Sequence, residues 1–374
     1  MSLTVIQVVP ALESGGVERG TIEIATALSQ RGYRSVVISG GGRLEEELAA
    51  GGSEHITLPI GRKSPLTLRL IPRLRGILRE RHADIVHARS RMPAWITYLA
   101  WRGMTPGARP RFVTSVHGPY SVNPYSRIMM KGERIIAISS FIRDYILKNY
   151  PTVESRRITT IHRGVDPDRF PYGYRPDDNW LQNWRLEQPQ LEHRYLITLP
   201  ARITHWKGQR DFIRIIAELV DSGLNVHGLM VGGVEESRRA YLRELQSLAE
   251  GLGITGNITF TGHRSDLREI MSVSGLVLSL ASEPEAFGRT ALEALTLGVP
   301  VIAYDHGGAG EVLRAMFPEG LTTPGNISSV VDMTRRFYRD PPLVAKQNPF
   351  PLERMIIDTI AVYEELAGHG TPPS

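Results

Sequence analysis

Two carboxylates eight positions apart, Glu285 and Glu293, lie on either side of a predicted helix start. Residues 289–297 have helical periodicity and end at a glycine, and apolar runs at 277–280 and 299–303 predict a strand before and after the helix. This arrangement places Glu285 in the loop before the helix and Glu293 one to two turns inside it. The pair could therefore lie at both ends of a ligand that binds at the helix N-terminus.

The chemistry available at such a helix start suits a sugar nucleotide. The first turn presents unpaired N–H groups and a partial positive charge, so Phe287, Gly288 and Arg289 could receive a diphosphate. Glu293, roughly 7 Å further along at 1.5 Å per residue, lies where a ribose diol would arrive. Glu285 could accept hydrogen bonds from the hydroxyls of a transferred sugar. The alternative is an ordinary surface helix with a solvated glutamate.

Two loops of the first half carry further candidates at the ends of predicted strands, where ligands bind in open α/β sheets. Gly15 and Gly16 precede a predicted helix at 17–30 and could admit a phosphate or sugar close to the backbone, although a tight turn also needs glycines. They do not form the GxGxxG fingerprint, which argues against a dehydrogenase. His117 ends a predicted strand and could serve as a hydrogen-bond donor or acid/base, or it could only cap the turn.

The second half carries matching loops. Arg202 and Lys207 are five positions apart across a strand-to-helix turn and could converge on one diphosphate, with a solvated loop as the alternative. Gly233 and His263, which follow two further predicted strands, could flank a base. These four residues complete a predicted donor site.

The elements that must position these residues alternate between apolar strands and helices, which predicts parallel sheets covered by helices. Residues 171–193 are rich in Pro, Asp, Asn and Gln and are predicted to link domain 1–170 to domain 194–350. Residues 352–366, in the segment 351–374, are predicted to form a helix that packs back on the first domain. The predicted strands are 5–9, 35–39, 85–88, 112–117 and 134–138 in the first half, and 196–199, 226–231, 258–261, 276–280 and 299–303 in the second.

Composition narrows the function classes. The chain has 374 residues, 41% hydrophobic and 22% charged, which is ordinary for a globular protein with two α/β domains. The absence of cysteine excludes disulfides, thiolate metal sites and thiol nucleophiles. The sequence runs directly into a strand without a signal-like segment and has no run of 18 apolar residues, so we expect a cytoplasmic location.

Charge is distributed unevenly. Residues 1–170 carry 25 Lys and Arg against 14 Asp and Glu, a net +11, whereas residues 171–374 carry 19 against 25, a net −6. Much of the excess lies between residues 62 and 91 and forms a basic amphipathic pattern. That pattern predicts attraction to an anionic membrane surface, peripheral at the inner face of the cytoplasmic membrane, or to an acidic acceptor; a solvated helix face is the alternative. Nucleic acid is not an expected partner, because aromatic interleaving and a recognisable module are missing.

Taken together, these motifs resemble the retaining glycosyltransferases of family 4, the glycogen-synthase-like and lipopolysaccharide-type enzymes. The resemblance covers nearly the whole chain and also includes Gly164-Val165-Asp166. It implies the GT-B fold: an α/β protein of two Rossmann-like parallel-sheet domains that face each other across a cleft. One departure is that the family often has Asn before Gly-Val-Asp, where this chain has Arg163.

The resemblance also implies roles for the candidate residues. Arg202 and Lys207 would bind the donor diphosphate, Glu293 the ribose, and Glu285 the donor sugar. The backbone of Ala286, Phe287 and Gly288 would assist, and His117 would lie beside the transferred sugar. The donor is expected to be UDP-linked. The acceptor, a glycan or lipid-linked glycan such as lipopolysaccharide core, is expected to contact loops of the first domain through Arg89, Arg91, Tyr120, Asn123, Tyr125, Arg127 and Lys131.

The expected reaction needs no metal or other cofactor. Cleavage of the sugar–diphosphate bond develops negative charge that Arg202, Lys207 and the helix N-terminus would stabilise. Asp166 and Asp168 superficially resemble a metal-binding Asp-x-Asp, and a turn is the favoured interpretation. Two other functions remain open on the sequence: a sugar-nucleotide epimerase and a catalytically silent carbohydrate-binding subunit.

Overall fold

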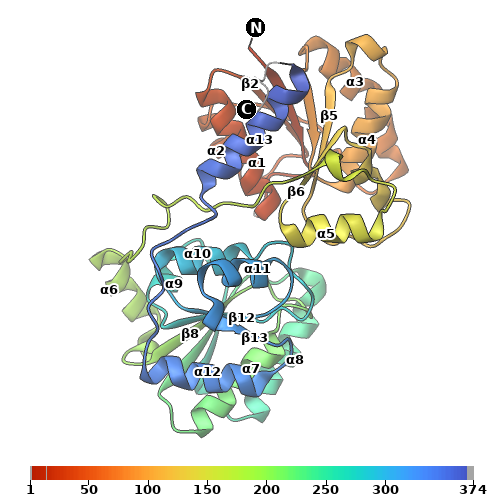
Figure 1. Cartoon of the computed structure of the whole chain (residues 1–374). Coiled ribbons are helices and arrows are strands. Elements are labelled where there is room, and N and C mark those ends of the chain that lie inside the picture. Colours follow the sequence, from red (N-terminus) through yellow and green to blue (C-terminus); the bar gives the residue numbers. More distant parts are fainter. Residues whose placement is uncertain (1, 14, 369–374) are drawn as a thin grey trace. The chain divides into compact units, whose positions relative to one another are not determined.

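The computed structural model of this protein describes residues 2–13 and 15–368. The chain divides into two compact units (Figure 1). One comprises the chain up to Gly164 together with the segment from Leu352 onward, and the other comprises Val165–Pro351. The chain therefore passes between the units twice. At these crossings, within the second unit, Val165 pairs with Pro351 in a parallel bridge.

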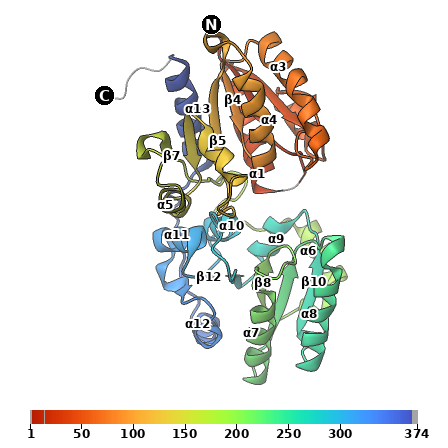
Figure 2. The ribbon, with the colours of Figure 1, turned by 90° about the vertical axis from the view of Figure 1, so that its right-hand side faces the viewer.

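A seven-stranded parallel sheet forms the centre of the first unit, in the order β3-β2-β1-β4-β5-β6-β7. Figure 2 shows β4, β5 and β7 of this sheet beside helices α3 and α4. Every residue of β1 is buried, as expected of a parallel strand covered by helices on both faces. The strands are β1 Thr4–Val8, β2 Arg34–Ser39, β3 Glu54–Thr57, β4 Ile85–Ala88, β5 Arg111–Val116, β6 Arg134–Ala137 and β7 Ile158–Thr160.

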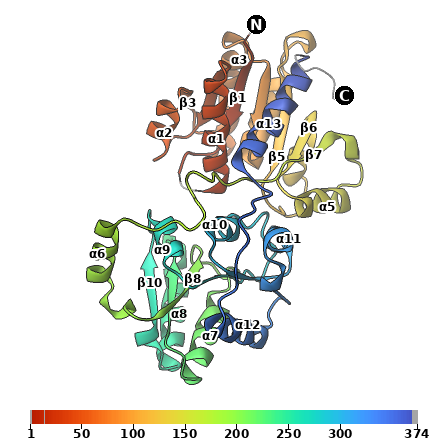
Figure 3. The same cartoon turned by 60° about the vertical axis from the view of Figure 1, so that its left-hand side comes forward.

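Helices α1 and α13 pack against each other over this sheet (Figure 3). Ile24 and Leu28 of α1 share a buried cluster with Ile360 and Tyr363 of α13, so the C-terminal helix completes the core of the first unit. The helices of this unit are α1 Gly16–Gln30, α2 Glu45–Ala50, α3 Ile71–Glu80, α4 Arg91–Arg102, α5 Ser140–Asn149 and α13 Leu352–Ala367.

The second unit contains a six-stranded parallel sheet in the order β10-β9-β8-β11-β12-β13. Its strands are β8 Tyr195–Pro200, β9 Val226–Val231, β10 Ile258–Gly262, β11 Leu276–Ser279, β12 Val301–Tyr304 and β13 Leu321–Thr322. Its helices are α6 Asp178–Glu187, α7 Gln209–Asp221, α8 Arg239–Gly251, α9 Leu267–Ser272, α10 Arg289–Leu297, α11 Gly307–Met316 and α12 Ile327–Arg339. The predicted α/β class with two Rossmann-like parallel-sheet domains is confirmed.

Residues 171–193, which were predicted to link the domains, lie inside the second unit and contain α6. Asp177 caps this helix by accepting a hydrogen bond from the N–H of Trp180 at 2.8 Å. Trp184 is buried with Leu191 against the sheet residue Leu196. The polar composition of this stretch thus conceals buried anchors that hold it on the sheet.

In each sheet the strand order reverses at one point, between β1 and β4 in the first unit and between β8 and β11 in the second. Ligands of open parallel sheets bind beyond the carboxyl ends of the strands at such a point. The loops that start there are those containing Gly15 and Gly16, Arg89 to Arg91, Arg202 to Lys207, and Glu285. The topology therefore gathers most of the predicted site residues at two switch points.

Candidate active site

Lys207 and Glu285 form the central ion pair of the second unit's switch point. Nζ of Lys207 lies 2.8 Å from Oε1 of Glu285, and the two side chains are only 19% and 16% exposed. The ammonium also lies 4.3 Å from the ring centroid of Trp206, a cation–π contact. Lys207 and Glu285 are 78 positions apart in the sequence, yet they form one ion pair that is partly shielded from solvent.

The loop carrying Glu285 is fixed by backbone contacts with the start of α11. The N–H of Gly308 donates to the carbonyl of Glu285 at 2.7 Å. Gly288, the residue before α10, has φ +81°, and a Cβ there would lie 2.6 Å from Cα of Ala309. Sequence reasoning missed this support, although the glycine-rich run His306-Gly-Gly-Ala-Gly310 was a visible signal for it.

Helix α10 begins at Arg289, as predicted, and some of the candidate side chains are turned inward. Phe287 is 4% exposed and packs edge-on against Phe350, so its side chain is not exposed to a ligand. Oε1 of Glu293 accepts from Nε of Arg289 at 3.0 Å, and the two side chains are 12% and 19% exposed. Arg289 thus holds the Glu293 carboxylate along the helix one turn from the loop.

Arg202 pairs with a different carboxylate from the one that Lys207 contacts. Its side chain is 70% exposed, and Nη1 lies 3.6 Å from the carboxylate of Glu235, whose side chain is 59% exposed. Gly233 lies nearby, because its carbonyl accepts from the N–H of Ile203 at 3.1 Å. A Cβ on Gly233 would lie 3.5 Å from Cβ of His263, so these two predicted neighbours are indeed adjacent.

In the first unit, Gly15 and Gly16 open helix α1. Gly15 is the extended N-cap residue, and a Cβ on Gly16 would meet no atom of the described residues within 4 Å. Neither packing nor a left-handed backbone requires a glycine at position 16. Open space beside a helix N-terminus is what close approach of an anionic ligand requires.

Gly16→Ala is therefore expected to leave the free energy of unfolding unchanged or slightly raised, because alanine favours helix, while lowering the affinity for a nucleotide sugar. Thermal unfolding and ligand titration measure the two effects. Gly76→Ala, at a half-buried position in the middle of α3, is the matched control and should change stability alone. Unchanged affinity in Gly16→Ala would remove position 16 from the site.

His117 lies just beyond the end of β5. Its backbone N–H donates to the hydroxyl of Tyr120 at 3.3 Å, and its Nε2 is buried with no hydrogen-bond partner among the described residues. Burial lowers its pKa well below the usual value, and the charges of Arg89 and Arg163 act in the same direction. The imidazole is therefore neutral near pH 7 and suits hydrogen bonding to a hydroxyl rather than charge neutralisation.

Arg91, at the start of α4, is held between two aromatic rings. Its guanidinium carbon lies 4.7 Å from the ring centroid of Tyr120 and 5.3 Å from that of Tyr125, and Nη1 donates to Oγ of Ser126 at 3.2 Å. Arg127 is exposed close by. This group could bind a hydroxylated or anionic ligand through stacking and charge.

Two of the predicted acceptor residues, Asn123 and Arg89, form hydrogen bonds within the first unit. Oδ1 of Asn123 accepts from the N–H of Ser126 at 2.8 Å and so shapes the turn. Arg89 is only 3% exposed, and its Nη1 donates to Oε1 of Gln7 at 2.5 Å and to the carbonyl of Gly20 at 3.1 Å. Arg89 is therefore buried among backbone and side-chain partners and does not face an acceptor. The sequence alone could not show this burial.

The Asp166 and Asp168 pair forms a turn. Oδ1 of Asp166 accepts from the N–H of Asp168 at 2.9 Å, an Asx-type turn. Among the residues that the structure describes, no cluster of three or more His, Asp or Glu side chains has the geometry to hold a metal ion.

Two Rossmann-like parallel-sheet units with these polar loops are the architecture of GT-B glycosyltransferases. The model for Glycosyltransferase Family 4 matches residues 14–169, and that for Glycosyl transferases group 1 matches residues 182–349. The chain therefore belongs to the family 4, group 1 glycosyltransferases, as the sequence motifs predicted.

Individual relatives agree with this assignment. The crystal structure of a glycosyltransferase from Rickettsia africae ESF-5 is 30% identical, with a TM-score of 0.87, and the match covers 99% of this chain and 100% of that one. D-inositol 3-phosphate glycosyltransferase of Rhodococcus opacus is 27% identical over 84% of this chain and 72% of that protein. Anabaena HepE, solved in complex with UDP and glucose, has the same fold at 19% identity, with a TM-score of 0.82 over 97% of this chain and all of that one.

Proposed function

We propose that this glycosyltransferase moves a hexose from a UDP-linked sugar to a cell-envelope glycan acceptor, with retention of the anomeric configuration and without a metal. The observation that carries the proposal is the Lys207–Glu285 pair at 2.8 Å beside the N-terminus of α10. A cation, a carboxylate and a helix N-terminus in one place suit a sugar joined to a diphosphate. The UDP and glucose bound by Anabaena HepE support a UDP-linked donor.

The assigned roles follow the charges of the donor. Lys207 and the long, exposed side chain of Arg202 neutralise the charge of the diphosphate. Glu293 accepts hydrogen bonds from the ribose hydroxyls. Glu285 and the backbone of residues 286–288 bind the hydroxyls of the hexose. On the first unit, the backbone at Gly15 and Gly16 and the neutral His117 contact the transferred group.

The reaction breaks the bond between the anomeric carbon and the diphosphate oxygen and forms a bond from that carbon to an acceptor hydroxyl oxygen on the same face. The acceptor proton passes to the departing diphosphate. Negative charge grows on the leaving group as the bond lengthens, so the cation of Lys207 and the α10 N-terminus stabilise the transition state more than the ground state.

The acceptor is proposed to carry hydroxyl and anionic groups that bind Arg91, Tyr120 and Arg127, as lipopolysaccharide core does. The stacked guanidinium of Arg91 supports this class. The name of the Rhodococcus opacus relative, D-inositol 3-phosphate glycosyltransferase, indicates a phosphorylated polyol as substrate there.

Metal independence has a direct test. Turnover should persist in excess EDTA and should not rise when magnesium or manganese is added, because Lys207, Arg202 and the helix end already compensate the diphosphate. Loss of turnover in EDTA with recovery on adding either ion would contradict the metal-free proposal.

A basic surface on the first unit supports a peripheral membrane location at the cytoplasmic face. Leu66 and Leu68 are 61% and 49% exposed, and the basic residues around them are exposed without an ion pair among the described residues. In the described part of the chain, no helix is long and apolar enough to cross a bilayer. Arg75 does not join this surface, since its Nε donates to the carbonyl of Ala100 at 3.3 Å. The basic surface consists of Arg62, Lys63, Arg69, Arg73 and Arg79.

Replacing four of these residues by glutamine should weaken binding to vesicles containing anionic lipid by on the order of 10³-fold at low salt, because each basic side chain near such a surface contributes about 1 kcal/mol. Sedimentation with vesicles measures the effect, and affinity for the nucleotide sugar should stay unchanged. The replaced set is Arg62, Lys63, Arg69 and Arg73.

The matched control replaces four exposed basic residues of the second unit that form no ion pair with any described residue, and it should bind vesicles as the parent does. Equal vesicle binding by the parent and the first-unit variant would show that the basic surface is only a solvated helix face. The control set is Arg185, Arg243, Arg339 and Lys346.

Product analysis tests the function as a whole. The protein is incubated with a labelled sugar nucleotide, with and without a lipid-linked acceptor extract. Label that moves to the acceptor fraction supports a transferase, an altered sugar still attached to the nucleotide supports an epimerase, and no reaction with any donor supports a silent binding subunit. A thermal-shift panel of nucleotide sugars identifies the donor, since a ligand at one hundred times its dissociation constant stabilises by about 2.7 kcal/mol.

A further inference from the structure

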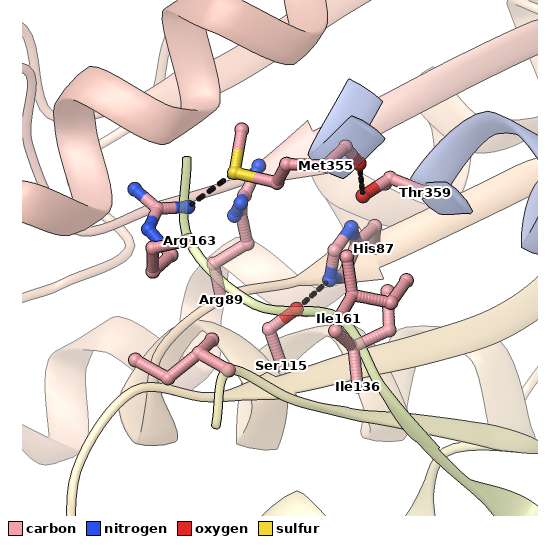
Figure 4. A pocket seen from close by; sticks show the side chains of 9 residues that line it. His87, Arg89, Ser115, Ile136, Ile161, Arg163, Met355 and Thr359 are labelled. Carbon is pink, nitrogen blue, oxygen red and sulfur yellow. Dashed lines mark hydrogen bonds between the residues drawn. The ribbon is translucent and has the colours of Figure 1, made fainter. Parts of the chain in front are cut away.

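Arg163 is buried directly beneath the start of helix α1. It is 5% exposed, and its Nη2 donates to the carbonyl of Gly16. Its Nη1 lies 3.7 Å from Sδ of Met355 on α13 (Figure 4). The side chain is therefore held by both α1 and α13 within the first unit. This is the position at which the family often has asparagine, which is too short to span the same distance.

Gly20 makes room for that guanidinium. A Cβ on Gly20 would lie 2.0 Å from Nη2, 2.1 Å from Nη1 and 2.3 Å from Cζ of Arg163. Its φ is not positive, so the backbone conformation itself does not demand glycine. The glycine in the second turn of α1 is therefore explained by the arginine that lies against it.

A second arginine holds the same part of the helix. Arg89, which lies beside Arg163 in the lining of a small cavity, donates to the carbonyl of Gly20. The two guanidinium groups thus bind carbonyls at Gly16 and Gly20, one helical turn apart. Both are more than nine-tenths buried.

Stability alone does not account for this arrangement. A cation near the N-terminus of a helix opposes the helix dipole, and a buried guanidinium costs free energy even when it is paired. Glu18 and Glu23 offset part of the charge on Arg89. The buried charge makes the N-terminus of α1 more attractive to an anion.

The contact also sets the direction of one peptide group. In a trans peptide the C=O and the following N–H point in opposite directions. With the carbonyl of Gly16 fixed on Arg163, the N–H of Val17 is turned the other way, and it is one of the N–H groups that a helix start leaves unpaired. Arg163 therefore controls how the start of α1 presents a hydrogen-bond donor.

We propose that Arg163 is a positioning residue that orients the Gly16–Val17 peptide for the phosphate of the donor, and that Gly20 is the glycine that admits it. The phosphate part of this proposal rests on the proposed transferase function. The orientation of the peptide does not.

A double-mutant cycle tests the pairing. Gly20→Ala in the parent chain should lower the midpoint of thermal unfolding and lower kcat/KM for the donor by on the order of 10-fold, because the guanidinium must leave Gly16. In an Arg163→Asn background the same Gly20→Ala step should have little further effect, since the space is then free. Equal losses in both backgrounds would overturn the pairing. Gly76→Ala is the control for a glycine replacement in a helix.

Hydrogen exchange of the N–H groups at residues 19 and 20, the first that are paired within α1, tests the orientation of the peptide without any measurement of activity. Exchange in Arg163→Asn should be at least 10-fold faster there and unchanged in α7, and Arg163→Lys should recover part of the protection because its charge can still reach the carbonyl. Unchanged exchange would overturn the positioning role.

The kinetic constants then test the link to the donor. Arg163→Asn should raise KM for the nucleotide sugar and lower kcat, with KM for the acceptor unchanged; faster exchange with parental kinetics would overturn that link. If the parent turned over no donor, the proposed function would fail, and hydrogen exchange with the unfolding cycle would still decide the peptide orientation.

Discussion

Lys207→Met is expected to lower turnover by on the order of 10²-fold or more. Methionine retains an unbranched apolar stem against Trp206 but removes the cation that lies 2.8 Å from Glu285. That cation is proposed to stabilise charge that grows on the departing diphosphate, and loss of one such group typically costs 10² to 10³ in kcat. The measurement is steady-state turnover of the labelled donor.

Two controls separate chemistry from folding. Lys346→Met removes an exposed lysine from the same unit and should leave turnover unchanged. Lys207→Met leaves the Glu285 carboxylate uncompensated in a partly shielded place, so it should also lower stability; the double variant Lys207→Met/Glu285→Gln should regain stability without regaining turnover. Near-parental turnover in Lys207→Met would refute the donor-site assignment.

Gly208→Ala should produce the largest loss of stability, on the order of 3 kcal/mol or more. Gly208 precedes α7 with φ +79°, which costs a residue with a side chain about 1 kcal/mol or more. Its Cβ would also lie 2.1 Å from the carbonyl oxygen of Leu280, so backbone must move. Urea unfolding measures the loss.

Gly223→Ala isolates the steric part of that loss. Gly223 has φ +80°, and a Cβ there would meet no described atom within 4 Å. It should therefore show only the backbone cost, about 1 kcal/mol. Similar losses in the two variants would mean that the close packing of Gly208 on Leu280 contributes nothing to stability.

The local sequence pattern predicted an element well where the element carries its own periodicity and end signals. Helix α10 was predicted at 289–297 and has those bounds, because helical periodicity and Gly298 mark it on their own. Strands β3, β7 and β13 were missed. They are short strands at sheet edges, with two to four residues and partly exposed side chains, so they lack the apolar run that identifies a buried strand.

The candidate site was predictable in its residue types and less so in its partners. The motifs identified Lys207 and Glu285, but their direct contact depends on how β8 and β11 adjoin in the sheet. Arg89 contacts Gln7 and lines one small cavity with Met355 and Thr359 of α13, all of which are distant in sequence. Long-range packing of this kind leaves no local periodicity to detect.

The two crossings of the chain have a consequence for synthesis. The second unit is an uninterrupted stretch, Val165–Pro351, whereas the first needs α13. Tyr363 of that helix is 0% exposed, and its hydroxyl lies 2.6 Å from Nδ1 of His87. Domains commonly fold in the order in which they are synthesised. Here the second unit can fold before the first, because the first unit lacks α13 until synthesis is nearly complete and its apolar face is uncovered until then. A nascent chain stalled near residue 350 should therefore bind chaperones through the incomplete first unit.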